Sequence, residues 1–165
     1  MLFRSVVVID ANLKLSYAAS AAAVSIDNSS ERIAMFNKAI GAMKMVRTYR
    51  TLPGDVAATD NDIGRIYLRM AEAEKRLNNP DGERRFFNEA IGYFIPVLDN
   101  ADASLAEVRI HLEESYFIVL PLMLKLGEYR DVQHYAAAYL NHFPSGKHAA
   151  DIRAWLNEAN INLRK

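Results

Sequence analysis

The chain has 165 residues, of which 51% are hydrophobic and 24% charged, with 20 basic and 20 acidic side chains and no cysteine. This length and composition predict one globular domain or one compact array with a core of ordinary size, and they exclude general disorder. The lack of cysteine excludes disulfides, thiolate metal sites and a cysteine nucleophile, and the balanced charge argues against a general nucleic-acid binder.

Apolar residues recur at intervals of three and four along almost the whole chain, which predicts helices throughout. The first helix is expected over residues 3–26. It resembles a signal peptide only faintly, because Asp10, Asn12 and Lys14 interrupt its apolar stretch. No run of 18 apolar residues occurs, so we predict no membrane-spanning helix.

Two polar clusters mark the next helix boundaries. Asn28 followed by Glu31 resembles a capping box, so a second helix is expected to begin there. It should end near Thr51, because residues 53–54 are Pro-Gly, a pair of strong helix breakers. The polar residues 59–62 are then expected to cap or open a third helix.

The middle of the chain carries two further boundaries. The segment 78–82 should end the third helix, with Pro80 in the first turn of the fourth, where its missing N–H costs nothing. A polar break over 99–102 should end the fourth helix. Ser104 and Glu107 form a second capping box, which predicts the start of the fifth helix.

The carboxyl-terminal part reads as three helices. Gly127 should end the fifth helix, the sixth should cover 129–142, and a seventh should follow the Pro-Ser-Gly turn at 144–146. Pro96 and Pro121 fall inside apolar helical runs, where each is expected to kink its helix. The prediction is therefore an all-α protein of about seven helices.

The chain also repeats itself. Residues 36–41 (FNKAIG) and 87–92 (FNEAIG) agree at five of six positions, and the match extends to Val46 and Val97. This similarity indicates that a helix pair has been duplicated. Phe94 lies on the apolar side of the second copy and is expected to be buried.

The third helix pair resembles a known repeat family. Residues 125–131 (KLGEYRD), followed by Pro144, look like the turn of a tetratricopeptide repeat, and the register places Val119 and Ala136 at packing positions. The tail 143–156 is similar to repeat junctions of two bacterial envelope proteins, the Tol–Pal coordinator and the outer-membrane assembly lipoprotein D.

The resemblance implies one tetratricopeptide-like domain over 1–165. Its helices would form antiparallel pairs stacked in a right-handed superhelix, because a single pair cannot bury its own apolar face. The expected pairs cover about 3–51, 59–99 and 103–142, and a capping helix covers 147–163.

We predict no catalytic, cofactor or metal site, and so no enzyme. His111 has no second histidine at the one-turn spacing that a metal site needs, and His142 and His148 lie on either side of the Pro144 turn without a fixed geometry. The neighbouring carboxylates Glu113 and Glu114 point in different directions on a helix, so they do not form an acid–base pair.

On the tetratricopeptide register, the first helix of each pair lines a concave groove. Phe117 and Pro121 replace the Lys and Asn that some family members use to hold chaperone tails, so that partner is excluded. An exposed Phe117 is expected to anchor the partner at the centre of the groove. The partner-binding residues predicted in this way are Arg65, Leu68, Glu72, Lys75, Arg76, Phe117, Pro121, Leu124 and Lys125.

The predicted function is a protein–protein interaction scaffold or adaptor that binds a peptide or helix of a partner. The resemblance implies bacterial envelope assembly in the periplasm, with the cytoplasm as the alternative compartment. Two other functions stay open: a homodimerisation platform within a longer chain, and a helical ligand-binding domain or enzyme with a polar pocket near His111 and Glu114. Neither nucleic acid nor a membrane span is expected.

Overall fold

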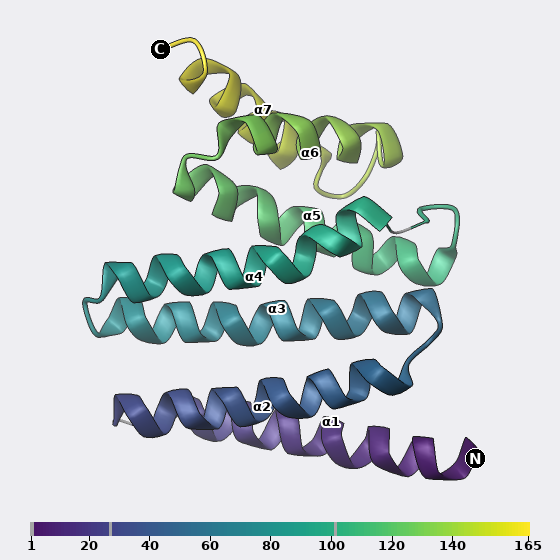
Figure 1. Ribbon diagram of the computed structural model, residues 1–165. Helices are drawn as coiled ribbons and strands as arrows, with labels where there is room; N and C mark the ends of the chain where they lie inside the picture. Colours follow the sequence, from purple (N-terminus) through teal and green to yellow (C-terminus); the bar gives the residue numbers. More distant parts are fainter. Residues whose placement is uncertain (1, 27, 101) are drawn as a thin grey trace. The chain divides into compact units, whose positions relative to one another are not determined.

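The computed structural model describes residues 2–26, 28–100 and 102–165, with side chains from residue 6 onward. These residues form seven helices and no strand, which confirms the predicted all-α class (Figure 1). The chain divides into two compact units, Met1–Tyr93 and Phe94–Lys165, and α4 contributes to both. The helices are α1 (Leu2–Val24), α2 (Ser29–Tyr49), α3 (Pro53–Arg76), α4 (Pro80–Asn100), α5 (Ala106–Leu126), α6 (Tyr129–His142) and α7 (Ala149–Asn162).

The first unit is built around the helices α1, α2 and α3. α1 buries a stripe of small residues at one-turn spacing, including Ala19 and Ala23, which lets α2 approach it closely. The larger core side chains come from α2 and α3, with Phe36, Met43 and Ile63 almost completely buried. α2 begins as predicted, because the Asn28 side chain accepts hydrogen bonds from two backbone N–H groups of the first turn.

The predicted start of α3 was wrong. α2 ends at Tyr49 and α3 begins at Pro53, so the polar residues 59–62 lie inside α3 and do not cap it. Pro53 occupies the first turn, where its fixed φ suits a helix and its missing N–H costs nothing. The two residues read as helix breakers therefore start a helix.

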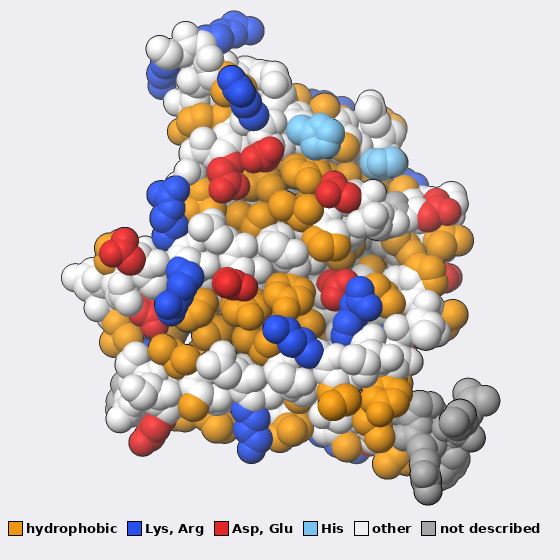
Figure 2. Space-filling model, viewed as in Figure 1, with side chains coloured by type: hydrophobic (Ala, Val, Ile, Leu, Met, Phe, Trp, Pro, Cys, Tyr) orange, Lys and Arg blue, Asp and Glu red, His pale blue; other side chains and the backbone are white. Residues whose placement is uncertain are grey.

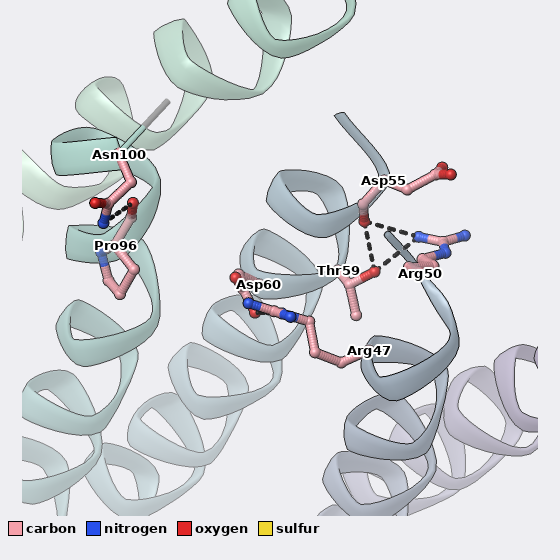
Figure 3. Close-up of polar contacts among 7 residues, drawn as sticks. All are labelled: Arg47, Arg50, Asp55, Thr59, Asp60, Pro96 and Asn100. Atoms are coloured by element: carbon pink, nitrogen blue, oxygen red, sulfur yellow. Dashed lines mark hydrogen bonds and ion pairs between the residues drawn. The ribbon is translucent and has the colours of Figure 1, made fainter. Parts of the chain in front are cut away.

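Residues from α2 and the short connection after it satisfy the polar groups inside α3. Arg47 Nε lies 2.8 Å from Asp60 Oδ1, and Arg50 Nη1 donates to Thr59 Oγ1 over 2.8 Å. Thr59 Oγ1 also donates to the backbone oxygen of Asp55 over 2.7 Å (Figure 3). Thr59 and Asp60 are buried, so these contacts supply the partners that burial of a polar group requires.

Replacing Arg47 by methionine is expected to lower the free energy of unfolding by about 1–2 kcal/mol. The substitution leaves the Asp60 carboxylate, 7% exposed, without its cation. The expected loss of stability is smaller than for a fully buried ion pair, because the Arg47 side chain is 43% exposed and solvent screens its charge. Urea unfolding of the parent, Arg47→Met, Asp60→Asn and the double variant measures the coupling. If the losses of the two single variants add up to that of the double variant within about 0.5 kcal/mol, Arg47 and Asp60 do not stabilise the fold through their contact.

The turn between α3 and α4 is closed by two asparagines. Asn78 adopts the left-handed conformation with φ 58°, and the Asn79 N–H donates to the Glu74 backbone oxygen over 3.0 Å. The Asn79 side chain then accepts from the Gly82 N–H over 3.1 Å and donates to the Glu74 carboxylate over 2.6 Å. α4 begins at Pro80 as predicted.

The second unit contains the end of α4 and the helices α5, α6 and α7. The predicted capping box at Ser104 was wrong, because α5 begins one residue later, with Leu105 at the N-cap and no side-chain cap. The Ser104 N–H instead donates to Asp102 Oδ1 over 2.9 Å. Asp102 thus closes a local turn before the helix, which competes with a cap at Ser104.

Aromatic side chains fill the core of the second unit. The ring of Tyr116 meets that of Tyr139 edge-on with centroids 5.6 Å apart, and Phe143 lies 5.1 Å from Tyr139. Gly146 lies so close to the Tyr139 hydroxyl that a Cβ atom at position 146 would clash with it. This close approach explains a glycine in the turn before α7.

Several predicted features of the later helices are confirmed. α5 ends at Leu126 with Gly127 as its C-cap, in the left-handed conformation with φ 81°, and α6 has the predicted bounds. Pro96 and Pro121 both lie inside helices. The Asn100 side chain donates to the backbone oxygen of Pro96 over 3.0 Å at the end of α4 (Figure 3). The kinks expected at the two prolines stay a prediction.

Candidate functional site

The first unit contains a groove flanked by α1 and α3, with α2 supplying part of its floor. One end of the groove is a pocket of about 360 Å³ at the carboxyl-terminal ends of α1 and α3. We call it the basic pocket, because three arginines line it. Its lining residues are Val24, Arg32, Phe36, Arg69, Glu72, Ala73, Arg76 and Leu77.

A second pocket of about 270 Å³ continues the groove toward the middle of α1 and α3. We call it the tyrosine pocket. Arg69 lines both pockets, so the two lie next to each other along α1 and α3. The lining residues of the tyrosine pocket are Ser16, Tyr17, Ser20, Met43, Asp62, Arg65, Ile66 and Arg69.

Hydrogen bonds fix two of the arginines in the basic pocket. Arg69 Nη1 donates to the buried Ser20 hydroxyl over 2.8 Å, and Arg32 Nε donates to the backbone oxygen of Ile26 over 2.7 Å. Among the residues that the structure describes, Arg69 and Arg76 form no ion pair. The pocket therefore presents cationic groups that retain capacity for an anionic partner.

The tyrosine pocket has mixed charge. Arg65 Nη1 lies 3.9 Å from Asp62 Oδ1, and the Tyr17 hydroxyl donates to Asp62 Oδ2 over 3.4 Å. Partial burial, followed by the nearby Asp62 carboxylate, raises the pKa of Tyr17 above its ordinary value. Tyr17 is nevertheless 57% exposed, so its ring is available for contact with a partner.

Three of the predicted partner-binding residues line this groove. Glu72 and Arg76 border the basic pocket, and Arg65 borders the tyrosine pocket. Leu68 is half-buried and Lys75 is exposed, and neither lines a pocket described above. In the second unit, Pro121 and Leu124 are half-buried and Lys125 is exposed.

Phe117 was expected to stand exposed, and it is not. Its ring stacks on His148 with centroids 3.7 Å apart and an interplanar angle of 19°, and Trp155 lies 5.5 Å away. The start of α7 thus covers Phe117, which is half-buried. The ring packs within the second unit, so its role as an exposed anchor has no geometric support.

The groove also contains residues that sequence reasoning missed. Arg69 lies at one-turn intervals from Arg65 and Glu72, so a strict helical spacing of four and three residues along α3 would have found it. Ser20 and Arg32 come from α1 and α2. No spacing within α3 could have indicated them.

Side chains of both charges occur on the face of the molecule that Figure 2 shows. On the face shown in Figure 2, blue, red and orange side chains are interspersed and no large area carries one charge. Within the described residues, no group of three or more His, Asp or Glu side chains could hold a metal ion.

Among the residues that the structure describes, one helix has the length and composition of a membrane span. Val6–Val24 of α1 is long and apolar enough to cross a bilayer by length and composition, and 22% of it is buried. A signal sequence or a core helix near the amino terminus can have the same composition. The predicted lack of a membrane span stays a prediction.

Comparisons with known proteins add no relative. A scan against protein-family models, a search of curated proteins and a search of solved structures each found no match to this chain. The function is therefore inferred from the geometry of the groove.

Proposed function

We propose that the chain is a protein-binding module that takes a peptide or a helix of a partner protein in the groove between α1 and α3. The observation that carries the proposal is the adjacency of the two pockets, which share Arg69 as a lining residue. A groove with apolar walls and charged residues along its rim suits an extended or helical segment. Exposed apolar side chains at the groove, such as Val24 and Leu77, supply contact area.

The proposed arrangement of the whole chain is a tetratricopeptide-like array. In such an array, α1–α2, α3–α4 and α5–α6 would be antiparallel pairs stacked in a right-handed superhelix, with α7 as its cap. The resemblance of residues 125–131 to a tetratricopeptide turn supports this part, as does the repeat of 36–41 at 87–92. A role as a scaffold in bacterial envelope assembly follows from the same resemblance.

The test is selection of peptides from a random display library, followed by calorimetric titration of the selected peptides. Tyr17→Ala removes an exposed ring from the groove and should weaken binding at least about tenfold, which is about 1.4 kcal/mol. Tyr49→Ala is the matched control, because Tyr49 is 44% exposed on α2 and lines neither pocket. It should leave affinity unchanged.

Two results would overturn the proposal. One is a library from which the folded chain selects no peptide. The other is the reverse pattern in the two variants, with Tyr49→Ala weakening binding and Tyr17→Ala leaving it intact, because the peptide would then bind outside the groove.

A further inference from the structure

We infer that the partner segment lies in the groove in an extended conformation, and that the tyrosine pocket binds one of its backbone peptide groups through the Ser16 hydroxyl and the Arg69 guanidinium. This inference rests on the proposed function and decides between the two kinds of ligand that it allows, an extended peptide and a helix. The observation behind it is a buried hydroxyl group that lines the pocket and has no hydrogen-bond partner within the described residues.

The Ser16 hydroxyl is a buried polar group that the fold itself does not satisfy. Ser16 is 1% exposed, and within the described residues its hydroxyl takes part in no hydrogen bond. Every described side-chain nitrogen or oxygen atom that is sealed from solvent does have a partner. Ser16 Oγ must therefore reach open space, and the space that Ser16 lines is the tyrosine pocket.

A comparison with another buried serine shows what is unusual about Ser16. A serine inside a helix commonly donates to the backbone oxygen four residues before it. Ser115 does so, because its hydroxyl donates to the His111 backbone oxygen over 2.7 Å. Ser16 does not use the equivalent oxygen of Asn12. Since burial of a hydroxyl without a partner is costly, the arrangement favours a partner that comes from outside the fold.

Arg69 places further donors next to Ser16. Arg69 Nη1 donates to the Ser20 hydroxyl over 2.8 Å, and Ser20 lies one turn after Ser16 on the same buried face of α1. A guanidinium group has five N–H donors, and the bond to Ser20 is the only hydrogen bond that the Arg69 side chain forms within the described residues. Donors of Arg69 therefore remain for a carbonyl oxygen close to the Ser16 hydroxyl.

A backbone peptide group supplies both partners at once. Its C=O accepts from a guanidinium N–H, and its N–H donates to a hydroxyl oxygen. In an extended segment these groups are open to a partner, whereas in a helix they are paired with each other. A helix laid in the groove would reach Ser16 and Arg69 only with side chains. Side chains that end in an amide or a carboxylate carry related groups, so the experiment changes only the peptide backbone.

The first experiment uses the peptides selected by display. Each peptide is remade as a series in which an ester replaces one amide at a time, which removes the N–H donor and weakens the carbonyl acceptor. At one position the ester should weaken binding to the parent chain about fivefold, which is the ordinary contribution of one hydrogen bond. Ser16→Ala should weaken the all-amide peptide by a similar factor and should bind this ester as tightly as the amide.

Ser25→Ala is the matched control. Ser25 is exposed, directly follows α1 and lines neither pocket, so its truncation should change affinity by less than about twofold and keep the ester effect. The conformation of the bound peptide is measured separately, from the ¹³C chemical shifts of its Cα atoms. These shifts should have the sign of an extended chain.

The second experiment needs no selected peptide. N-methylacetamide, a small mimic of the peptide group, and methyl acetate, its ester counterpart, are titrated into the parent chain and into Ser16→Ala, with the Arg69 side-chain N–H signals followed by NMR. N-methylacetamide should shift these signals in a saturable way and bind the parent about fivefold more tightly than Ser16→Ala. Methyl acetate should bind the two chains equally.

The outcomes separate this inference from the proposed function. If selected peptides need Tyr17 but bind as helices, or if no ester effect depends on Ser16, the inference is overturned and the protein-binding groove stands. If no peptide is selected and N-methylacetamide still binds at Ser16 and Arg69, the pocket recognises a peptide group but the proposed function fails. Equal binding of N-methylacetamide to the parent and to Ser16→Ala overturns the inference.

Discussion

Replacing Phe94 by alanine is expected to lower the free energy of unfolding by about 3–5 kcal/mol. Phe94 lies in α4 and begins the second unit, and its side chain is completely buried. Removing the ring would take apolar surface out of a packed environment and leave a cavity that its neighbours fill only in part. The loss is measured from urea unfolding curves followed by circular dichroism, with the slope checked against that of the parent.

Ile110→Ala is the matched control for Phe94→Ala. Ile110 belongs to α5 in the same unit and is 71% exposed, so its truncation should change stability by less than about 0.5 kcal/mol. A loss below about 1 kcal/mol for Phe94→Ala would contradict the repeat register that predicted its burial. Equal losses of unfolding free energy for Phe94→Ala and Ile110→Ala would contradict the register as well.

The apolar spacing predicted the seven helices because that signal is local. Each helix buries one stripe, and residues three and four apart on that stripe must be apolar whatever the partner helix is. One helix boundary was wrongly predicted because a residue on another helix decided the outcome. Asp60 resembles a helix cap in sequence, but Arg47 on another helix lets it lie buried inside α3.

The site was predictable only in part, for the same reason. Arg65, Glu72 and Arg76 share a face of α3, so helical spacing brought them together. Arg32 enters the pocket from α2, and nothing in the α3 sequence points to it. The predicted exposure of Phe117 was wrong. The repeat register leaves its ring exposed, but the start of α7 packs against it.

Alkaline pH is expected to destabilise the second unit. Burial raises the pKa of Tyr116 to about 12, with the Asp99 carboxylate adding to the effect. Burial likewise raises the pKa of Tyr135 to about 12, helped by its hydrogen bond to Asp99. Burial and a hydrogen bond to Glu113 raise the pKa of Tyr139 to about 12.

The direction of the effect follows from proton binding. An unfolded tyrosine has a pKa of about 10, so the folded chain holds these phenol protons more tightly than the unfolded chain. The resulting stabilisation is complete below about pH 10 and is lost as the pH rises from about 10 to about 12. For Tyr116 the loss is on the order of 1–2 kcal/mol by pH 12, after allowance for solvent screening. Tyr135 and Tyr139 add to it in the same direction.

Tyr116→Phe isolates one of these phenols from every other group that titrates at high pH. The variant keeps the edge-on ring contact with Tyr139 and should match the parent at pH 7 to within about 1 kcal/mol. Between pH 10 and pH 12 it should lose less stability than the parent, because the ionisation that favours the unfolded chain has one site fewer. Denaturant midpoints measured across this pH range in parent and variant provide the test. Parallel curves for the two chains would show that the Tyr116 proton does not stabilise the fold.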